Sequence, residues 1–154
     1  MVALKLSSDG FEPFALVLDR FRQNLENAEP AFRDIAAYQK TVVNARVFAQ
    51  QGSAETGRWS PLSPRYGAWK ARVRPGRPIL VFDGDLRQAF TSMQHGVSEV
   101  WDRGMVVGAA DPIARYHQDG TDTMPARPIL GRAAKKDSRH MAKIFQQFII
   151  DGGS

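Results

Sequence analysis

Apolar residues in the first third of the chain recur every three or four positions, the period of helices with one buried face. Residues 11–25 form the first such stripe, with Asp9 placed to cap the helix and Pro13 tolerated in its first turn. Pro30 suits the first turn of a second helix, which we expect to end near Gly52. We predict that the two helices form an antiparallel hairpin.

Other parts of the chain show the two-residue period of strands. Residues 2–6 alternate in this way, and residues 97–101 and 105–108 predict a β-hairpin with a glycine in the turn. Residues 79–82 and 124–130 are the further candidates, the latter as an edge strand because its prolines favour extended backbone. We expect the last four segments to form one small antiparallel sheet.

The end of the chain returns to the helical period. Residues 111–120 predict one or two helical turns closed by glycine, and a last helix starting near Ala133 has an apolar face. The elements together predict an α+β fold, in which the sheet packs with the N-terminal helical hairpin and the C-terminal helix. The predicted core is mainly Phe14, Leu18, Phe21, Ile35, Val42, Val100, Val106, Ile129, Phe145 and Phe148.

Residues 58–86 follow neither period. This stretch reads RWSPLSPRYGAWKARVRPGRPILVFDGDL and contains four prolines, two tryptophans and a tyrosine. Such a mixture cannot propagate a long helix or a central strand, whereas irregular contact arms often carry large rings. We therefore predict a long Pro/Trp-rich loop, called the strap below and placed at residues 53–78.

Local signals predict short elements within and after the strap. Ser63 followed by proline suits the start of a helix over residues 65–73, and Asp83 is placed to cap another through Phe90. The polar residues 52–57 predict a flexible joint. We expect the strap to be mobile in an isolated subunit and ordered in an assembly.

Length and composition set broad limits. A chain of 154 residues suits one domain, and we assign residues 1–154 to it. The absence of cysteine excludes disulfides and thiolate metal sites. The N-terminus lacks a signal-peptide pattern, and no apolar run approaches the roughly 20 residues of a membrane helix. We therefore expect a soluble protein made in the cytoplasm, with no membrane partner.

The net charge of +5 is unevenly placed. Residues 1–57 hold six basic and seven acidic side chains (−1), against fifteen and nine in residues 58–154 (+6). Six of the cations and no acid lie between Arg58 and Phe82. Such a run suits a phosphate backbone or an acidic protein face, and the alternative is a solvated loop.

The aromatic side chains have three interpretations: core, subunit interface, or platform for stacked bases. We place Trp101 in the core. For the strap we favour an interface over core packing, because Trp and Tyr commonly anchor interfaces, and the prolines between them argue against base stacking. The predicted interface residues are Trp59, Pro61, Leu62, Tyr66, Trp69 and Lys70.

Four segments of the chain are distinctive when taken in order: WSPLSPRYGAWK at 59–70, RPILVFDGDL at 77–86, YHQDG at 116–120 and MPARPILG at 124–131. Together they resemble the phage virion morphogenesis family, the tail-completion proteins of Mu-like and P2-like contractile phages and prophages. Each segment alone is weak evidence, but the four in this order are specific. The motif positions expected to be structural are Tyr116, His117, Gly120, Pro125, Arg127 and Pro128.

The resemblance implies a small α+β neck protein that acts late in assembly, at the head–tail junction of the virion. It implies a ring of identical subunits, a hexamer favoured over a dodecamer, beside head-connector and tail-terminator or tail-tube proteins and without a cofactor. Basic side chains would then face either a neighbouring protein or packaged DNA, which they would contact without reading its sequence. The candidates are Arg72, Arg74 and Arg77, with Lys135, Lys136 and Arg139 as the second choice.

A nucleic-acid-binding module and a hydrolase are the alternative classes. The residues considered as a metal or acid–base cluster are His117, Asp119, Asp83 and Asp85. However, His117 and Asp119 are two positions apart and would point to different faces of a helix. The sequence has neither a Gly-x-Ser-x-Gly elbow nor a phosphate-binding Gly-rich loop. We therefore expect no enzyme, no catalytic residue and no metal site, with Asp83 as a helix cap and His117 as a partly buried, hydrogen-bonded ring.

Overall fold

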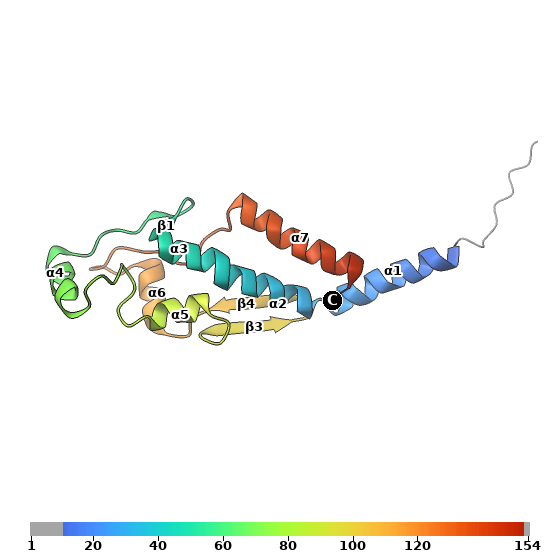
Figure 1. Cartoon of the computed structure of the whole chain (residues 1–154), viewed down its shortest axis with the longest axis horizontal. Helices are drawn as coiled ribbons and strands as arrows, with labels where there is room; N and C mark the ends of the chain where they lie inside the picture. The colour runs from blue at the N-terminus through green and yellow to red at the C-terminus, as the bar shows by residue number, and fades with distance from the viewer. Residues whose placement is uncertain (1–10, 153–154) are drawn as a thin grey trace, which may run out of the picture.

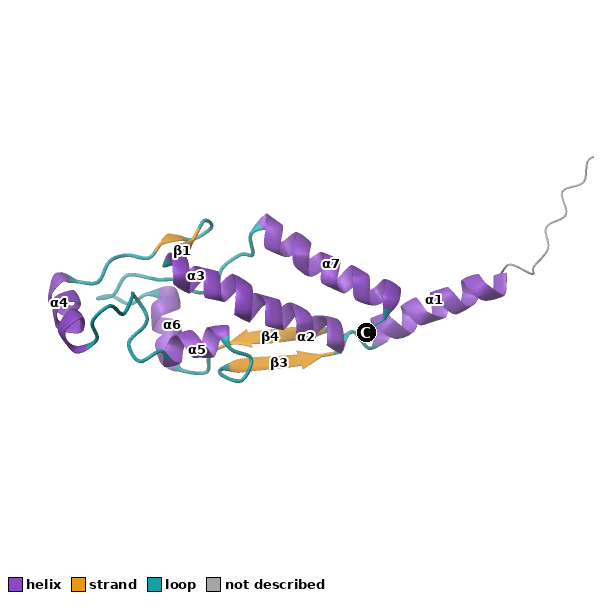
Figure 2. Ribbon diagram, in the orientation of Figure 1, coloured by secondary structure: helices purple, strands orange, loops and turns teal. Residues whose placement is uncertain are grey.

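The computed structural model describes residues 11–152, so the predicted strand at residues 2–6 and the cap at Asp9 lie outside the described residues. Figures 1 and 2 show an elongated body of three layers, from which one helix projects. The middle layer is a helical rod, with a C-terminal helix on one side and a β-hairpin on the other. The fold is α+β, as predicted.

The rod runs without interruption from residue 29 to residue 50. It consists of α2 (Glu29–Tyr38), a π-helical turn, η2 (Gln39–Asn44), and α3 (Ala45–Gln50), which confirms the predicted second helix. The π-helical turn contains the fully buried Lys40, whose Nζ donates to the carbonyl of His95 at 2.7 Å and to Ser98 Oγ at 2.8 Å. These hydrogen bonds fix the β-hairpin against the rod.

The C-terminal helix α7 (Lys135–Asp151) packs along α2. Its first turn is held by Asp137, a buried carboxylate that accepts from Tyr38 Oη and from Arg46 Nη1, both at 2.8 Å. Hydrogen bonding from the Arg46 guanidinium, followed by that from Tyr38, holds the pKa of Asp137 below its usual value despite burial. The predicted last helix is therefore confirmed, with a buried polar link that the sequence pattern did not reveal.

The predicted helical hairpin is wrong, because α1 (Phe11–Glu26) does not fold back on α2. Helical hydrogen bonds flank the junction, from the Asn27 N–H to the Gln23 carbonyl and from the Phe32 N–H to the Ala28 carbonyl, both at 3.1 Å. Figure 1 shows that α1 and α2 run in the same general direction, so the chain does not reverse between them. Helix α1 instead projects from the body (Figure 1). Its contact with α7 lies near its end, where Asn24 Nδ2 donates to the carbonyls of Phe148 and Ile149.

The β-hairpin of β3 (Val97–Trp101) and β4 (Gly104–Gly108) is confirmed, in antiparallel register from Val97 opposite Gly108 to Trp101 opposite Gly104. The other two predicted strands are wrong. Residues 79–82 form a turn in which Leu80 has a left-handed backbone (φ 59°). Residues 124–130 join no ladder, because two of them are prolines and nearby N–H groups bond to α6 instead.

Three short helices complete the fold: α4 (Pro64–Val73), α5 (Asp85–Thr91) and α6 (Pro112–Asp119). The short helix predicted over residues 65–73 is confirmed by α4. Helix α6 is capped by Asp111, whose Oδ1 accepts from the Ile113 N–H at 2.8 Å. The predicted cap of α5 is wrong: Gly84 occupies that position, and Asp83 instead pairs with Arg74.

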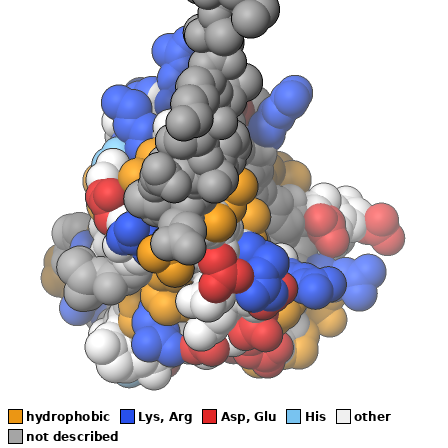
Figure 3. Space-filling model, turned by 90° about the vertical axis from the view of Figure 1, so that its right-hand side faces the viewer, with side chains coloured by type: hydrophobic (Ala, Val, Ile, Leu, Met, Phe, Trp, Pro, Cys, Tyr) orange, Lys and Arg blue, Asp and Glu red, His pale blue; other side chains and the backbone are white. Residues whose placement is uncertain are grey.

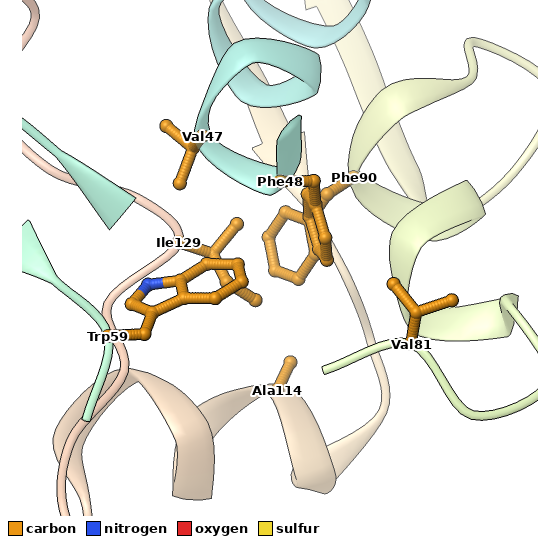
Figure 4. Close-up of a cluster of buried hydrophobic side chains, with 7 residues drawn as sticks. All are labelled: Val47, Phe48, Trp59, Val81, Phe90, Ala114 and Ile129. Atoms are coloured by element: carbon orange, nitrogen blue, oxygen red, sulfur yellow. The ribbon is translucent and has the colours of Figure 1, made fainter. Parts of the chain in front are cut away.

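The main hydrophobic cluster lies where α3, α5, α6 and the start of the strap meet, rather than under the β-hairpin (Figure 4). Of the predicted core residues, Ile35 and Ile129 are buried, whereas Phe21, Val100, Phe145 and Phe148 are half-buried. The prediction is wrong for Phe14, Leu18, Val42 and Val106, which are exposed. Trp101 is also exposed, and part of its ring lies against Gly104 at the turn of the β-hairpin.

Candidate interface around the strap

The strap begins with a tight turn in place of the predicted flexible joint. Strands β1 (Gly52–Ser53) and β2 (Gly57–Arg58) pair antiparallel across this turn. Gly52 has φ 135°, and a Cβ there would lie 2.2 Å from the Gly57 carbonyl oxygen, so the close approach requires glycine. The first residues of the strap are thereby fixed to the end of the helical rod.

Trp59 anchors the strap in the core, which corrects its assignment to an exposed interface. Trp59 is only 5% exposed, and its indole Nε1 donates to the Pro128 carbonyl at 2.8 Å. Its ring meets Phe48 edge to face, with centroids 5.4 Å apart, and lies beside Ile129 in Figure 4. An indole can be buried in this way because its one polar atom has a partner.

Two buried cations fix the next residues of the strap. Lys70 is 4% exposed and donates through Nζ to the Pro78 carbonyl, so the prediction that it faces a partner is wrong. Arg127 is equally buried, and its Nε and Nη2 donate to the carbonyls of Ser60 and Pro61, both at 2.8 Å. Burial lowers the pKa of both groups. Each cation therefore supplies hydrogen bonds to backbone carbonyl groups that have no partner in a β-ladder, and so holds the strap in place.

The Tyr-His-Gln-Asp-Gly motif forms the end of α6 and holds residues 124–131. Gln118, which sequence reasoning did not single out, accepts through Oε1 from the N–H groups of Ile129 and Leu130 at 3.0 Å and donates to the Leu130 carbonyl. Gly120 ends the helix at φ 78°, and a Cβ there would lie 2.8 Å from the Ala126 nitrogen. A glutamine shortly before a proline-containing, extended segment is the sequence signal that could have identified this link.

The other motif positions differ in their surroundings. Tyr116 and Pro125 are exposed, and His117 is half-buried. Burial, followed by the charge of Arg127, lowers the pKa of His117. Within residues 11–152 the His117 Nδ1 is buried without a hydrogen-bond partner, so the predicted hydrogen bond of this ring is wrong for that atom.

Three rings and a guanidinium form an exposed stack on the outer side of the strap. Trp69 is 42% exposed and stacks on Phe82 at 5.7 Å with an interplanar angle of 8°, and Tyr66 packs against Trp69 at 5.4 Å. The Arg74 guanidinium lies 4.8 Å from the Phe82 centroid and pairs with Asp83 at 2.7 Å. Among the predicted interface residues, Pro61 is also exposed and Leu62 is half-buried.

The candidate basic residues do not form one cluster. Arg74 belongs to the stack, whereas Arg72 and Arg77 are exposed and have no ion pair in the part of the chain that the structure describes. The second group, at the start of α7, is also exposed: Lys135, Lys136 and Arg139. The positions at the strap therefore suit contact with a partner more directly than those of α7, because they border exposed aromatic rings.

A groove of about 470 Å³ lies between α4 and α6. Its apolar lining includes Leu62, Tyr66, Leu80, Phe82, Ile113 and Met124. Three carboxylates, Asp83, Asp85 and Asp111, also border the groove. Among its residues, Leu80 keeps a left-handed backbone that non-glycine residues adopt at a cost of about 1–3 kcal/mol. Such strain is found most often at binding sites, which makes this groove a candidate site.

The described residues contain no group of three or more His, Asp or Glu side chains arranged to hold a metal ion. Two of the four residues considered as a metal or acid–base cluster are engaged elsewhere: Asp119 lies 3.6 Å from Arg115, and Asp83 pairs with Arg74. Between residues 11 and 152, no helix is both long and apolar enough to cross a membrane.

Comparison with known proteins gives one match. The sequence model of the phage virion morphogenesis family matches residues 9–149, which is nearly the whole chain. Neither the curated proteins nor the solved structures gave a match. The matched region includes both the projecting helix α1 and the strap.

Proposed function

The chain belongs to the phage virion morphogenesis family and has a structural role in virion assembly; from this we propose that it is a ring-forming subunit of the neck, which completes the tail and joins it to the head. Six subunits are the favoured number and twelve the alternative. Its neighbours would be a head-connector protein on one side and a tail-terminator or tail-tube protein on the other. It would act at the head–tail junction of the virion, after synthesis in the host cytoplasm.

One observation supports self-assembly most directly: two apolar surfaces lie uncovered at opposite ends of the subunit. The stripe of α1 is exposed at one end, and the stack of Tyr66, Trp69 and Phe82 lies at the other (Figure 1). Soluble monomers rarely leave large apolar patches uncovered unless these are binding surfaces. Two different surfaces on one chain favour head-to-tail contacts, which form a ring when the rotation between neighbouring subunits closes.

The basic residues of the strap favour contact with a neighbouring protein. Arg74 is already held by Asp83 and Phe82, and stacked guanidinium groups are typical of protein interfaces. Arg72 and Arg77 remain exposed and would set the rate and register of docking. Weak contact with packaged DNA is their second role in this proposal.

A joining assay tests the proposed function. DNA-filled heads and finished tails are prepared from particles that lack the protein, the purified chain is added, and infectious particles are counted. We expect joining to require the chain, and light scattering over a concentration series to show a ring. A matched pair of variants tests the strap: Trp69→Ala should reduce joining at least tenfold, whereas Val106→Ala, which is exposed on β4, should not.

Two outcomes would overturn the proposal. The first is joining that proceeds equally well without the chain. The second is a monomer at every concentration that binds DNA with an affinity falling steeply between 50 and 200 mM salt, since that salt dependence marks phosphate contacts and favours the nucleic-acid-binding alternative.

A further inference from the structure

The outer face of α7 carries basic side chains at the surface. Lys135, Lys136, Arg139 and Lys143 are exposed, and none of them has an ion pair among the residues that the structure describes. Lys136, Arg139 and Lys143 follow one another at spacings of three and four positions, so they share one side of the helix. We call these four side chains the α7 stripe. In Figure 3, which views the molecule from the end at which α1 projects, the charged groups highest in the view, on the side of α7, are Lys and Arg.

The α7 stripe is uniformly basic because the one acid nearby is turned inward. Residues 132–150 contain a single carboxylate, that of Asp137. It is 1% exposed and is held by Arg46 of the rod. On α2, by contrast, the exposed cation Arg33 pairs with Glu29 one turn away. A surface that serves only solubility carries charges of both signs interspersed, so the α7 stripe is a candidate binding surface.

The surroundings of the stripe favour a phosphate backbone over a protein surface. No large hydrophobic side chain is exposed between residues 135 and 147. Protein interfaces are built around apolar and aromatic anchors and contain few lysines, whereas three of the four stripe cations are lysines. Protein–DNA interfaces are by comparison polar and strongly basic. The stripe therefore differs from the exposed rings of the strap, which suit a protein partner. The exposed positions beside the stripe are Ser138, His140, Ala142, Gln146 and Gln147.

The dimensions of the stripe also suit DNA. From Lys135 to Lys143 the helix rises about 12 Å. Double-stranded DNA carries about seven phosphate charges over that length. Four cations along one side of a helix can therefore meet the backbone on one side of a duplex. Contacts to phosphates fix position and carry no sequence information.

We propose that the α7 stripe contacts the phosphate backbone of double-stranded DNA without reading its sequence. The inference rests on the proposed ring at the head–tail junction, where packaged DNA lies next to the subunits, and it names the surface of each subunit that faces the DNA. Helix α7 then lines the lumen of the ring, and the strap meets a neighbouring protein. Because exposed charges are screened by salt, the contact is weak and reversible.

Salt-dependent binding tests this assignment. Fluorescence anisotropy measures binding of the purified full chain to a labelled duplex between 50 and 200 mM salt. The stripe variant Lys136→Gln/Arg139→Gln/Lys143→Gln removes three exposed charges. Each phosphate contact contributes about 0.9 to the slope of log K against log salt concentration, so this variant should have a slope shallower by about 2–3. Two duplexes of different sequence should bind the wild type equally.

A matched control removes the same net charge elsewhere. The triple variant Arg20→Gln/Arg87→Gln/Arg103→Gln changes exposed cations on α1, on α5 and in the turn of the β-hairpin. None of these three has an ion pair within residues 11–152. We expect the control to keep the slope of the wild type, and circular dichroism should show both triple variants folded because all six positions are exposed.

Three outcomes would overturn the inference. The first is no DNA binding by the wild type at 50 mM salt. The second is an equal change of slope in the stripe and control variants, which would show a general effect of net charge. The third is loss of ring formation or of docking onto finished tails by the stripe variant, which would mark a surface that faces protein, an acidic one included. The inference can fail in each of these ways while the chain remains necessary for joining. A chain that is not needed for joining would refute the proposed function itself.

Discussion

The two tryptophans of the strap lie ten positions apart, and truncating them should affect different properties: the stability of the subunit for one and assembly for the other. Trp59 is buried, meets Phe48 edge to face, and donates to the Pro128 carbonyl. Trp69 is 42% exposed and touches Tyr66 and Phe82. We predict that Trp59→Ala strongly destabilises the isolated subunit, whereas Trp69→Ala mainly weakens assembly.

The magnitudes follow from these contacts. Truncating a buried tryptophan to alanine costs about 3–5 kcal/mol, and the loss of a neutral hydrogen bond from the Pro128 carbonyl adds about 1 kcal/mol. Each aromatic pair of Trp69 contributes about 0.5–1.5 kcal/mol, and solvent exposure keeps the total near 1–2 kcal/mol. The two variants should therefore differ by about 3 kcal/mol in free energy of unfolding.

Thermal and urea unfolding of the monomer, followed by far-UV circular dichroism, measures this difference. For a domain of this size 1 kcal/mol corresponds to about 2–4 °C, so the Trp59 variant should melt about 6–12 °C below the Trp69 variant. Trp59→Phe, which keeps a ring but not the indole N–H, should fall between them. Equal shifts for the two alanine variants would refute the assignment of Trp59 to the core.

Three further predictions concern single groups. Gln51 ends α3 with a left-handed backbone (φ 53°), so Gln51→Gly should stabilise the subunit by about 0.5–1 kcal/mol in thermal melts, and a lower melting temperature would contradict this. Asp137→Asn should lower the unfolding free energy by about 2–4 kcal/mol at pH 7. Because the pKa of Asp137 is lowered in the fold, its stabilising contribution is present above about pH 4 and lost below, so a variant with unchanged acid sensitivity would refute this role. Burial lowers the pKa of His117, so the wild type should lose stability as the pH falls from about 6.5 towards that lower pKa; His117→Leu should reduce this loss, and an unchanged pH profile would count against it.

Elements defined by local signals could be predicted from the sequence. The rod, α7, the short α4 helix and the β3–β4 hairpin all follow from apolar period, proline position and turn residues. The strand prediction failed at residues 79–82, where a short apolar run suggested a strand, and at residues 124–130, where two prolines suggested an extended edge strand. A strand also needs a neighbour with free backbone groups, and in residues 124–130 the partner is the Gln118 side chain.

Burial was harder to predict, because it depends on contacts between distant segments. Trp59 and Trp69 lie in the same proline-rich stretch, and nothing local distinguishes the one that meets Phe48 from the one that faces solvent. Lys70 is another example. Its neighbours in sequence are exposed cations, yet Lys70 itself is buried because its ammonium group donates to the Pro78 carbonyl of the same strap. For α1 the stripe was identified correctly, but an apolar face does not say whether its partner belongs to the same chain.

Anchoring of the strap changes the energetics expected for assembly. A mobile strap would lose about 1–2 kcal/mol of backbone entropy per residue on docking, which would oppose ring formation. Here Trp59, Lys70 and Arg127 hold the strap within the subunit, so most of that ordering already takes place on folding. In the proposed ring, Tyr66 and Trp69 would meet a partner as parts of a prearranged surface, and preorganised surfaces bind more tightly for the same area buried. Weakening an anchor should therefore reduce assembly even where the exposed rings are untouched: Arg127→Met should weaken joining at temperatures at which the subunit itself remains folded. Joining by this variant that equals the wild type would show that the strap orders equally well without its anchor.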